Sequence, residues 1–402
     1  MEKYFEFAIQ NVARHGDTDV FPFPIENYIF YDKPKEAVDI LKGIHSNFEQ
    51  ATNDYPPLHV KVLSVAGYSG FRPASQLDPI WNAYLLALVC SIAEDIEKVR
   101  VQADKKIVFS YRVKLNFTDF TLFDTYIGWH EYQLHSQELA KKHKFVLTCD
   151  ISDFYPRIYH HRLENALKKA TDSSDTVSRI MRLLSKFSDG VSYGLPIGGN
   201  AARILSELVL NRIDRLLVTH GITYCRYVDD FRIFTENQED AYNALLYLSE
   251  ILLSNEGLTL QKAKTRLMGN EEYISTSTFV EETQTGTELP ETQKFLNLKL
   301  RFDPYSPTAE DDYEELKKEL KKYDIVGMLT RELRKTRIDE SLTRKLVKSI
   351  KYLSPTPRNQ AVLSLLASLS TLYPLFTVVM MTFKSTLDDL EEETRITNQS
   401  IK

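Results

Sequence analysis

Short apolar runs of β-branched and aromatic residues occupy the middle of the chain. The clearest case is the stretch TYCRYVDDFRIFT, residues 223–235, in which two such runs flank Asp229 and Asp230. Side chains of this kind fit a pleated surface, so the stretch predicts a β-hairpin with the two aspartates at its turn. From residue 144 to about 267 the predicted order is strand, helix, helix, hairpin, helix, strand, which indicates an α/β or α+β layer.

Helical spacing of apolar positions dominates both ends of the chain. Residues 1–70 combine a short helix, a loop punctuated by prolines and an amphipathic helix, and every segment after Pro307 has helical spacing. The proline-rich stretch RFDPYSPT marks a boundary near Tyr305. We therefore predict an N-terminal helical extension (1–70), a central α+β region (71–305) and an all-helical C-terminal domain (306–402).

Residues 361–383 form an uncharged stretch of 23 residues, which is long enough to span a bilayer. Pro374 divides the stretch into two pieces of buried-helix length, and both pieces contain Ser or Thr. We favour a buried pair of helices over a membrane segment.

Composition indicates a globular protein: 402 residues, 43% hydrophobic and 26% charged, are enough for two or three domains. Cys90, Cys149 and Cys225 are too few and too scattered for a disulfide framework or a zinc site, so we expect core cysteines and a reducing cytoplasm. The N-terminus lacks the basic start and apolar run of a secretory signal.

The net charge of −6 argues against nucleic acid, but its distribution matters more than its sum. Residues 331–351 contain eight basic residues against three acidic ones. Such a stripe can follow a phosphate backbone, although a solvated helix face gives the same pattern. The candidate nucleic-acid ligands are Arg334, Lys335, Lys345 and Lys348.

The adjacent aspartates break the usual chemistry of a hairpin turn. Two-residue hairpin loops favour glycine or asparagine, whereas Asp229 and Asp230 repel each other. Two carboxylates on a rigid turn suit a hard divalent cation, and a solvated acidic turn is the alternative. A third carboxylate, Asp150, ends the apolar strand 145–149, and ligands commonly meet sheets at strand ends.

Between these elements, Gly194, Gly198 and Gly199 precede a long predicted helix in SYGLPIGGNAARILSEL. Glycines there permit close backbone approach, and a helix N-terminus favours an anion.

The strand-end aspartate, the G-x-P-x-G-G loop and the Tyr-x-Asp-Asp hairpin, in this order, resemble motifs A, B and C of the palm of reverse transcriptases. The segment GLTLQKAKTRL, with Lys264, resembles motif D, and FRPASQLDPIWNAYLLAL and VFSYR resemble segments of the fingers. The resemblance covers about residues 70–300. LPIGG with RILSEL, RYVDDF, GDTDVFPFPIE and the helical C-terminal part resemble the abortive-infection and other defence-associated (antiphage) bacterial enzymes.

The resemblance implies an α+β fold with the fingers and palm of a right-hand polymerase, followed by an all-helical, thumb-like or repeat-like domain. It also implies RNA-directed DNA synthesis from dNTPs with two divalent ions, Mg²⁺ or alternatively Mn²⁺. The implied metal ligands are Asp150, Asp229, Asp230 and the carbonyl of Ile151. The implied nucleotide-binding residues are Arg72, Arg112, Tyr155, Ile197, Gly198 and Lys264.

Within that set, the resemblance gives individual roles. Tyr155 would pack against the sugar and exclude a 2′-hydroxyl, and Lys264 would give a proton to pyrophosphate. Ile197 stands where many reverse transcriptases have Gln, so template-independent or protein-primed synthesis stays open.

The expected partners are an RNA template or non-coding RNA, the DNA product and dNTPs, and no membrane. We expect a cytoplasmic enzyme acting in antiphage defence with a dedicated RNA. Assembly with a second copy or a second subunit stays open. A non-catalytic RNA-binding scaffold is the alternative from another functional class.

Overall fold

The structure is a computed structural model that describes residues 1–16, 28–65, 71–188, 190–276, 294–296, 298, 316–334, 338–369, 372 and 375–386. The chain divides into two compact units. The larger contains the described residues of 1–62 and 73–276, and the smaller contains those of 63–72 and those after 278. Residues 1–62 thus share a unit with the central region, which differs from the predicted three-part division.

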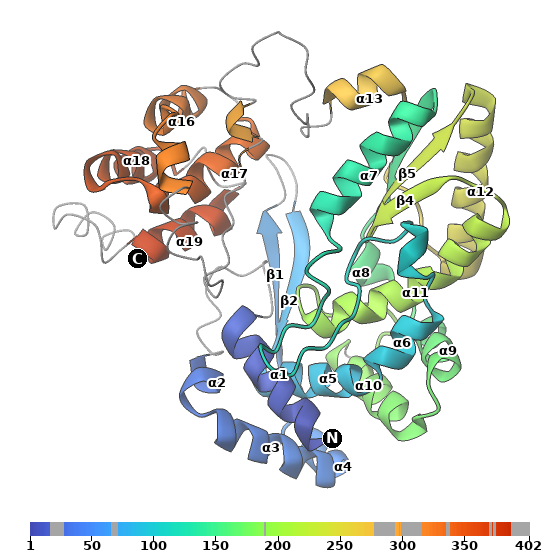
Figure 1. Cartoon of the computed structure of the whole chain (residues 1–402). Helices are drawn as coiled ribbons and strands as arrows, with labels where there is room; N and C mark the ends of the chain where they lie inside the picture. Colours follow the sequence, from blue (N-terminus) through green and yellow to red (C-terminus); the bar gives the residue numbers. More distant parts are fainter. Residues whose placement is uncertain are drawn as a thin grey trace. The chain divides into compact units, whose positions relative to one another are not determined.

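The larger unit contains a four-stranded antiparallel sheet with strand order β4-β5-β3-β6 (Figure 1). Its strands are β3 (Phe145–Asp150), β4 (Tyr224–Tyr227), β5 (Asp230–Thr235) and β6 (Arg266–Gly269). The predicted hairpin is therefore present, but its two-residue turn is Val228-Asp229, because Asp230 already pairs with Tyr227 and opens β5. The expectation of a turn made of both aspartates was wrong by one residue.

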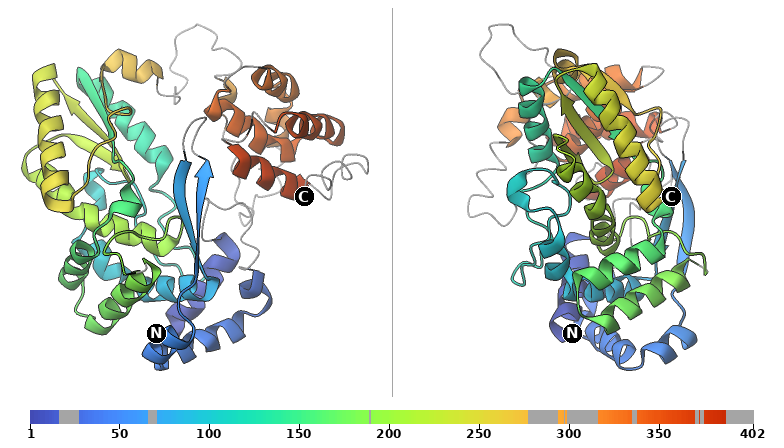
Figure 2. Two further views of the ribbon diagram at one scale, coloured as in Figure 1. Left: turned by 180° about the vertical axis from the view of Figure 1, so that it is seen from behind. Right: turned by 90° about the vertical axis from the view of Figure 1, so that its right-hand side faces the viewer.

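Both faces of this sheet are covered by helices. Successive strand residues point to opposite faces, so Leu147 and Ile233 join the core cluster that includes the apolar side of α12 (Gln238–Glu256). Val146 and Phe234 join a second cluster with α7 (Trp129–Lys142) and α13 (Asn270–Thr276). Figure 2 shows α7 and α12 on opposite sides of the strands.

The rest of the larger unit is mainly helical, with α5 (Pro79–Ser91) at its centre. This helix begins at Asp78, whose carboxylate accepts hydrogen bonds from the amides of Ile80 (2.9 Å) and Trp81 (3.3 Å), which satisfies two free N–H groups of the first turn. Leu85 and Leu88 are fully buried in the main core. The helices around it include α1 (Glu2–His15), α3 (Pro34–Ser46), α10 (Ser174–Phe187) and α11 (Asn200–Thr219).

The other described elements of this part of the chain are short. They are α2 (Tyr28–Asp32), α4 (Phe48–Asp54), α6 (Ala93–Val99), the 3₁₀ turn η2 (Ala103–Lys105), α8 (Phe154–Arg157) and α9 (His160–Ala170). A separate hairpin pairs β1 (His59–Val65) with β2 (Phe71–Leu77), and residues of this hairpin fall in both units.

The smaller unit is all-helical in its described residues after 278, as predicted for the C-terminal domain. Its core contains Leu329, Leu346, Leu365 and Val379, all fully buried. The contributing elements include α16 (Ile325–Leu333), α17 (Glu340–Ser349), η3 (Ile350–Tyr352), α18 (Pro355–Ala367) and α19 (Phe376–Thr386). The described part of residues 361–383 is thus a pair of helices that contributes to a protein core, as favoured above.

No single helix among the described residues is both long and apolar enough to cross a bilayer. The bent pair α5 and α6, with 53° between its two helices, meets the length and composition criteria when taken together.

All three cysteines are buried and free of disulfides, as their scattered positions predict. Burial raises the pKa of the Cys149 thiol to about 12. These cysteines are core residues of the larger unit.

Candidate active site

The register of β3 and β5 brings the three aspartates to one end of the sheet. Asp150 and Asp230 are direct cross-strand partners, and the amide of Ile151 donates to the carbonyl of Asp229 at 3.1 Å. Asp150 ends β3 and Asp230 begins β5, so each carboxylate leaves the sheet where the backbone pairing stops. Asp150 and Asp230, 80 positions apart in sequence, therefore meet, as the resemblance to a polymerase palm implies.

The hairpin turn holds Val228 in a strained backbone conformation, with φ of 56°. A β-branched residue rarely adopts this left-handed region, and such strain is maintained only where surrounding contacts stabilise it. The Val228 amide donates to the Ser110 hydroxyl at 2.9 Å, and its carbonyl accepts from Arg226 at 3.0 Å. Both polar groups of Val228 are fixed, which determines where the following Asp229 stands.

Lys264 forms an ion pair with Asp150 in this structure. Its ammonium lies 2.7 Å from the Asp150 carboxylate, and the Gln261 amide donates to the Asp150 carbonyl, also at 2.7 Å. The segment that resembles motif D therefore packs against the end of β3 and brings Lys264 to Asp150.

Burial and like charge act together on the hairpin aspartates. Burial raises the pKa of Asp229 to about 6, and the negative charge of Asp150 adds to the shift. The pKa of Asp230 is also raised, by burial first, although Arg232 and the Tyr132 hydroxyl oppose the shift. The Tyr132 hydroxyl lies 3.0 Å from the Asp230 carboxylate. The site holds more negative charge than its cations balance.

This donor set suits a divalent cation, because carboxylate oxygens are the ligands that Mg²⁺ prefers and an ammonium already stands at Asp150. In the side-chain positions of this structure, however, no group of three or more His, Cys, Asp or Glu residues in the described part of the chain converges as a metal-binding cluster. Asp150 instead pairs with Lys264, and Asp230 with Tyr132. The ligand assignments, including the carbonyl of Ile151, stay a prediction.

A buried ionic network lies beneath the hairpin. Arg226 is fully buried and makes a bidentate contact with Asp214 at 2.7 and 2.6 Å. It also contacts Glu207 at 2.9 Å, and Arg100 contacts the same carboxylate at 2.7 Å. Breaking such a buried pair typically costs about 3–5 kcal/mol, because one charge is left without a partner.

The glycine loop lies beside Tyr155. The Leu195 amide donates to the Tyr155 carbonyl at 3.0 Å, and the Gly194 amide donates to the Ile158 carbonyl at 2.9 Å. The Tyr155 hydroxyl accepts weakly from Ser206 of α11 at 3.5 Å. The segments that resemble motifs A and B are thus adjacent.

The loop also contains Gly198 and Ile197, which the resemblance assigns to nucleotide binding. Gly198 has φ of 108°, a region that favours glycine, and Ile197 is partly exposed. A Cβ at Gly199 would lie 3.1 Å from the Asn82 amide oxygen, so close packing also restricts this position.

Arg112, one of the two arginines predicted for the fingers, is not brought to the aspartates. Arg112 is buried and pairs with Glu97 at 2.8 Å, so its guanidinium is directed into the protein in this structure. Its pKa is lowered, by burial first. Arg72 lies in β2, and its side chain falls outside the described residues.

The basic residues proposed for RNA binding in the smaller unit differ in exposure. Arg334 and Lys348 are exposed, whereas Lys335 lies outside the described residues. Lys345 is partly buried and donates to the Leu296 carbonyl, and burial lowers its pKa to about 8. Lys345 is therefore an internal residue of this unit, which corrects its assignment to an RNA-binding surface.

Sequence reasoning missed the network under the hairpin and the contact of Tyr132 with Asp230. One signal for the network was available: Glu207 and Asp214 are seven residues apart in the mostly apolar α11, so they share one helix face. A buried acidic face requires a cation, and Arg226 directly precedes the Tyr-x-Asp-Asp motif.

The family model described as "Reverse transcriptase (RNA-dependent DNA polymerase)" matches residues 86–298, just over half of the chain. The retron Ec86 reverse transcriptase of Escherichia coli is 22% identical over 125 residues, which cover 31% of this chain and 38% of that relative.

Among solved structures, apo telomerase from Candida tropicalis is 12% identical, with a TM-score of 0.38, and the match covers 90% of this chain and 70% of that chain. Telomerase from Candida albicans in complex with a fragment of telomeric RNA is also 12% identical, with a TM-score of 0.39 and coverage of 87% and 67%.

Proposed function

This chain belongs to the reverse transcriptase family, and from that premise we propose that it is an RNA-directed DNA polymerase that adds dNTPs to a primer end. The observation that carries the proposal is the β3–β5 register, which places Asp150 opposite Asp230 and joins Ile151 to Asp229. The match to the retron enzyme, although it covers only 38% of that relative, supports the same reaction.

In this proposal Asp150, Asp229 and Asp230, with the carbonyl of Ile151, would hold two divalent ions, Mg²⁺ or Mn²⁺. Such ions lower the pKa of a primer hydroxyl and stabilise the charge of the triphosphate and of the leaving pyrophosphate. The protein supplies a rigid frame, because Val228 is fixed by Ser110 and Arg226 on either side of its peptide.

Lys264 and Tyr155 have supporting roles in the proposal. The ammonium of Lys264, 2.7 Å from the Asp150 carboxylate, would give a proton to pyrophosphate. Tyr155, held beside the glycine loop, would contact the sugar and favour dNTPs over rNTPs.

The biological setting rests on the resemblance to defence-associated bacterial enzymes: a cytoplasmic protein that acts against phage with a dedicated RNA. Ile197, where many relatives have Gln, favours a second candidate, template-independent or protein-primed deoxynucleotide transfer. Omitting the RNA template from the assay separates template-independent transfer from templated synthesis, since only the former persists without it.

The decisive experiment is the double substitution Asp229→Asn, Asp230→Asn. We expect a loss of dNTP incorporation by several orders of magnitude. The substitution removes carboxylates that would hold the divalent ions, and these ions would stabilise the charge of the transition state. Incorporation of labelled dNTPs measures the effect, and circular dichroism checks that the variant is folded. Near-normal incorporation by the folded variant would contradict a polymerase site here, and an inactive unaltered protein that binds RNA would support a non-catalytic scaffold.

A further inference from the structure

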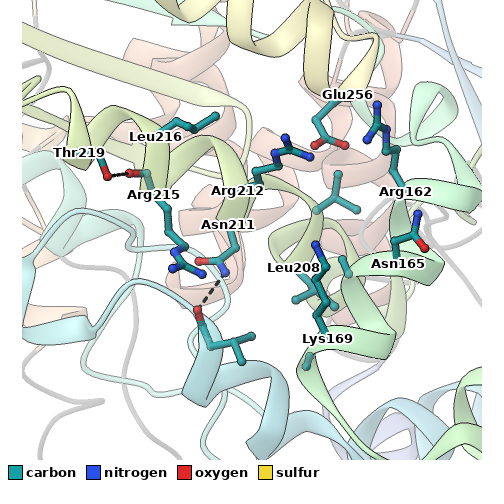
Figure 3. A pocket seen from close by; sticks show the side chains of 14 residues that line it. Arg162, Asn165, Lys169, Leu208, Asn211, Arg212, Arg215, Leu216, Thr219 and Glu256 are labelled. Atoms are coloured by element: carbon teal, nitrogen blue, oxygen red, sulfur yellow. Dashed lines mark hydrogen bonds between the residues drawn. The ribbon is translucent and has the colours of Figure 1, made fainter.

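A pocket of about 720 Å³ lies in the larger unit, away from the three aspartates. Helices α9, α11 and the end of α12 line it, with Val99 of α6 (Figure 3). Its volume is in the range of small-molecule sites, which is about 300–1,000 Å³.

Four basic side chains line this pocket: Arg162 and Lys169 from α9, and Arg212 and Arg215 from α11. Their spacings of seven and three residues place each pair on one helix face. None of the four makes a side-chain hydrogen bond or an ion pair within 4 Å to another residue in the described part of the chain. On a chain with a net charge of −6, this is a local concentration of unpaired positive charge.

One carboxylate shares the pocket. Glu256, the last residue of α12, is 8% exposed, and Figure 3 shows its oxygens between the side chains of Arg162 and Arg212. It accepts no hydrogen bond from the described residues and forms no ion pair with them. Burial raises its pKa to about 7, although the two arginines oppose the shift. A buried acceptor of this kind favours a ligand that supplies a hydroxyl or amino donor.

The two faces of α11 make different contacts. Glu207 and Asp214 bind Arg226 beneath the hairpin, whereas Arg212, Arg215 and Leu208 line the pocket. The pocket is therefore chemically separate from the aspartate site, and its ligand need not be the nucleotide that is incorporated.

We propose that this pocket binds a ribonucleotide. Arg162, Arg212 and Lys169 contact its phosphates, since guanidinium groups recognise phosphate oxygens in pairs. Glu256 accepts a hydrogen bond from a ribose hydroxyl or a base amino group, and the side chains of Ala166 and Leu216 offer apolar contact. The same chemistry is supplied by a free ribonucleotide and by one nucleotide of a bound RNA.

Binding to the full-length protein tests the proposal in a buffer with a chelator, so that the aspartates cannot hold a triphosphate through metal ions. The probes are fluorescent ATP and dATP, and a short single-stranded RNA with the DNA of the same sequence. Fluorescence anisotropy measures their affinities. The unaltered protein should prefer ATP to dATP, or the RNA to the DNA.

The test variant is Arg162→Gln, Arg212→Gln, and Lys168→Gln is its matched control. Lys168 is also on α9 but pairs with Glu164 at 2.5 Å instead of lining the pocket. We expect the double variant to bind about tenfold or more weakly, a change of about 1.4 kcal/mol or more. The control should stay within about twofold of the unaltered protein. Circular dichroism and thermal unfolding check that both variants are folded.

A second variant, Glu256→Ala, tests the hydroxyl or amino contact. It should retain affinity for phosphate-bearing probes. The ratio of the affinities for ribose and deoxyribose probes, or for probes with different bases, should fall towards one. ATP binding that the RNA does not compete with would assign the pocket to a free nucleotide. RNA binding without ATP binding would assign it to a nucleotide within RNA.

Three outcomes would overturn the proposal: no probe binds, the double variant binds every probe as the unaltered protein does, or inorganic triphosphate binds as well as ATP and Glu256→Ala changes nothing. The Asp229→Asn, Asp230→Asn variant should keep this binding. Failure of the pocket and failure of the polymerase proposal are therefore distinguishable.

Discussion

At the scale of single residues, two similarly buried carboxylates have different neighbours. Asp229 and Glu256 both have a pKa raised by burial, to about 6 and about 7. Asp229 faces a further carboxylate, Asp150, which increases the demand for a cation, whereas Glu256 faces Arg162 and Arg212. The identity of the neighbours, and not burial alone, distinguishes a metal-type site from a pocket for a mixed ligand.

Glu256 gives a prediction about stability and pH. Its folded-state pKa of about 7 lies above the ordinary value of 4.5, so the folded protein favours the protonated form. Stability should therefore fall as the pH rises from about 4.5 through about 7, because ionisation is easier in the unfolded chain. Glu256→Gln should reduce this slope, to which Asp229 with its pKa of about 6 also contributes, and be more stable than the unaltered protein above pH 7. Urea unfolding across this pH range measures the difference, and equal slopes would argue against it.

Tyr155 gives a prediction about the choice of sugar. If its ring contacts the sugar of the incoming nucleotide, then Tyr155→Ala should raise rNTP use relative to dNTP use. Single-nucleotide incorporation with paired rNTP and dNTP substrates measures the ratio. A folded, active variant with an unchanged ratio would leave Tyr155 only its contacts with the glycine loop and Ser206.

At the scale of elements, the hairpin and α11 are joined by one buried side chain. Arg226 of β4 is directed into the interior, where it contacts Glu207 and Asp214 on α11. It also donates to the Val228 carbonyl in the strained turn. The apolar pattern predicted the strands and the helix, because each pattern follows one element's own period. It did not predict the turn position or the ion network, because these depend on contacts between elements that are far apart in sequence.

Arg226→Met tests this link between the hairpin and α11. The substitution removes the buried cation but keeps a long apolar side chain, so Glu207 and Asp214 lose a partner and the protein should be destabilised by about 3–5 kcal/mol. Incorporation should also fall because Val228 loses its contact. The double variant Arg226→Met, Asp214→Asn should recover much of the stability without recovering activity, because Glu207 keeps Arg100 as its partner. Chemical unfolding and incorporation assays give the two readouts, and full recovery of activity would show that the network supports only stability.

At the scale of the whole molecule, the chain carries a net negative charge but gathers positive charge in places. In the described residues of the smaller unit, Arg334 and Lys348 of the basic stripe are exposed, but Lys345 is directed inward. Charge runs in a sequence do not reveal which side chains a fold turns towards its core, so this part of the site was predictable only in outline. The three aspartates were predictable because one family pattern contains all of them.

The exposed members of the stripe give a salt-dependent prediction. Arg334→Gln with Lys348→Gln should weaken RNA binding, and each lost phosphate contact should lower the slope of log affinity against log salt by about 0.9 on a duplex or about 0.7 on a single strand. Lys345→Gln should instead change stability, because its ammonium binds the Leu296 carbonyl. RNA titrations at several salt concentrations decide the matter, and an unchanged slope would mean that these residues lie on a solvated face.

The three buried cysteines can report on local opening of the core of the larger unit. Cys149 lies in the core that includes α12, Cys225 lies in the core that includes α7, and Cys90 lies in α5. With the Cys149 pKa raised to about 12 and no thiol at the surface, a thiol reagent reacts only when the structure opens. Single-cysteine proteins would thus let labelling rates show whether the two faces of the sheet and the central helix open together or one at a time.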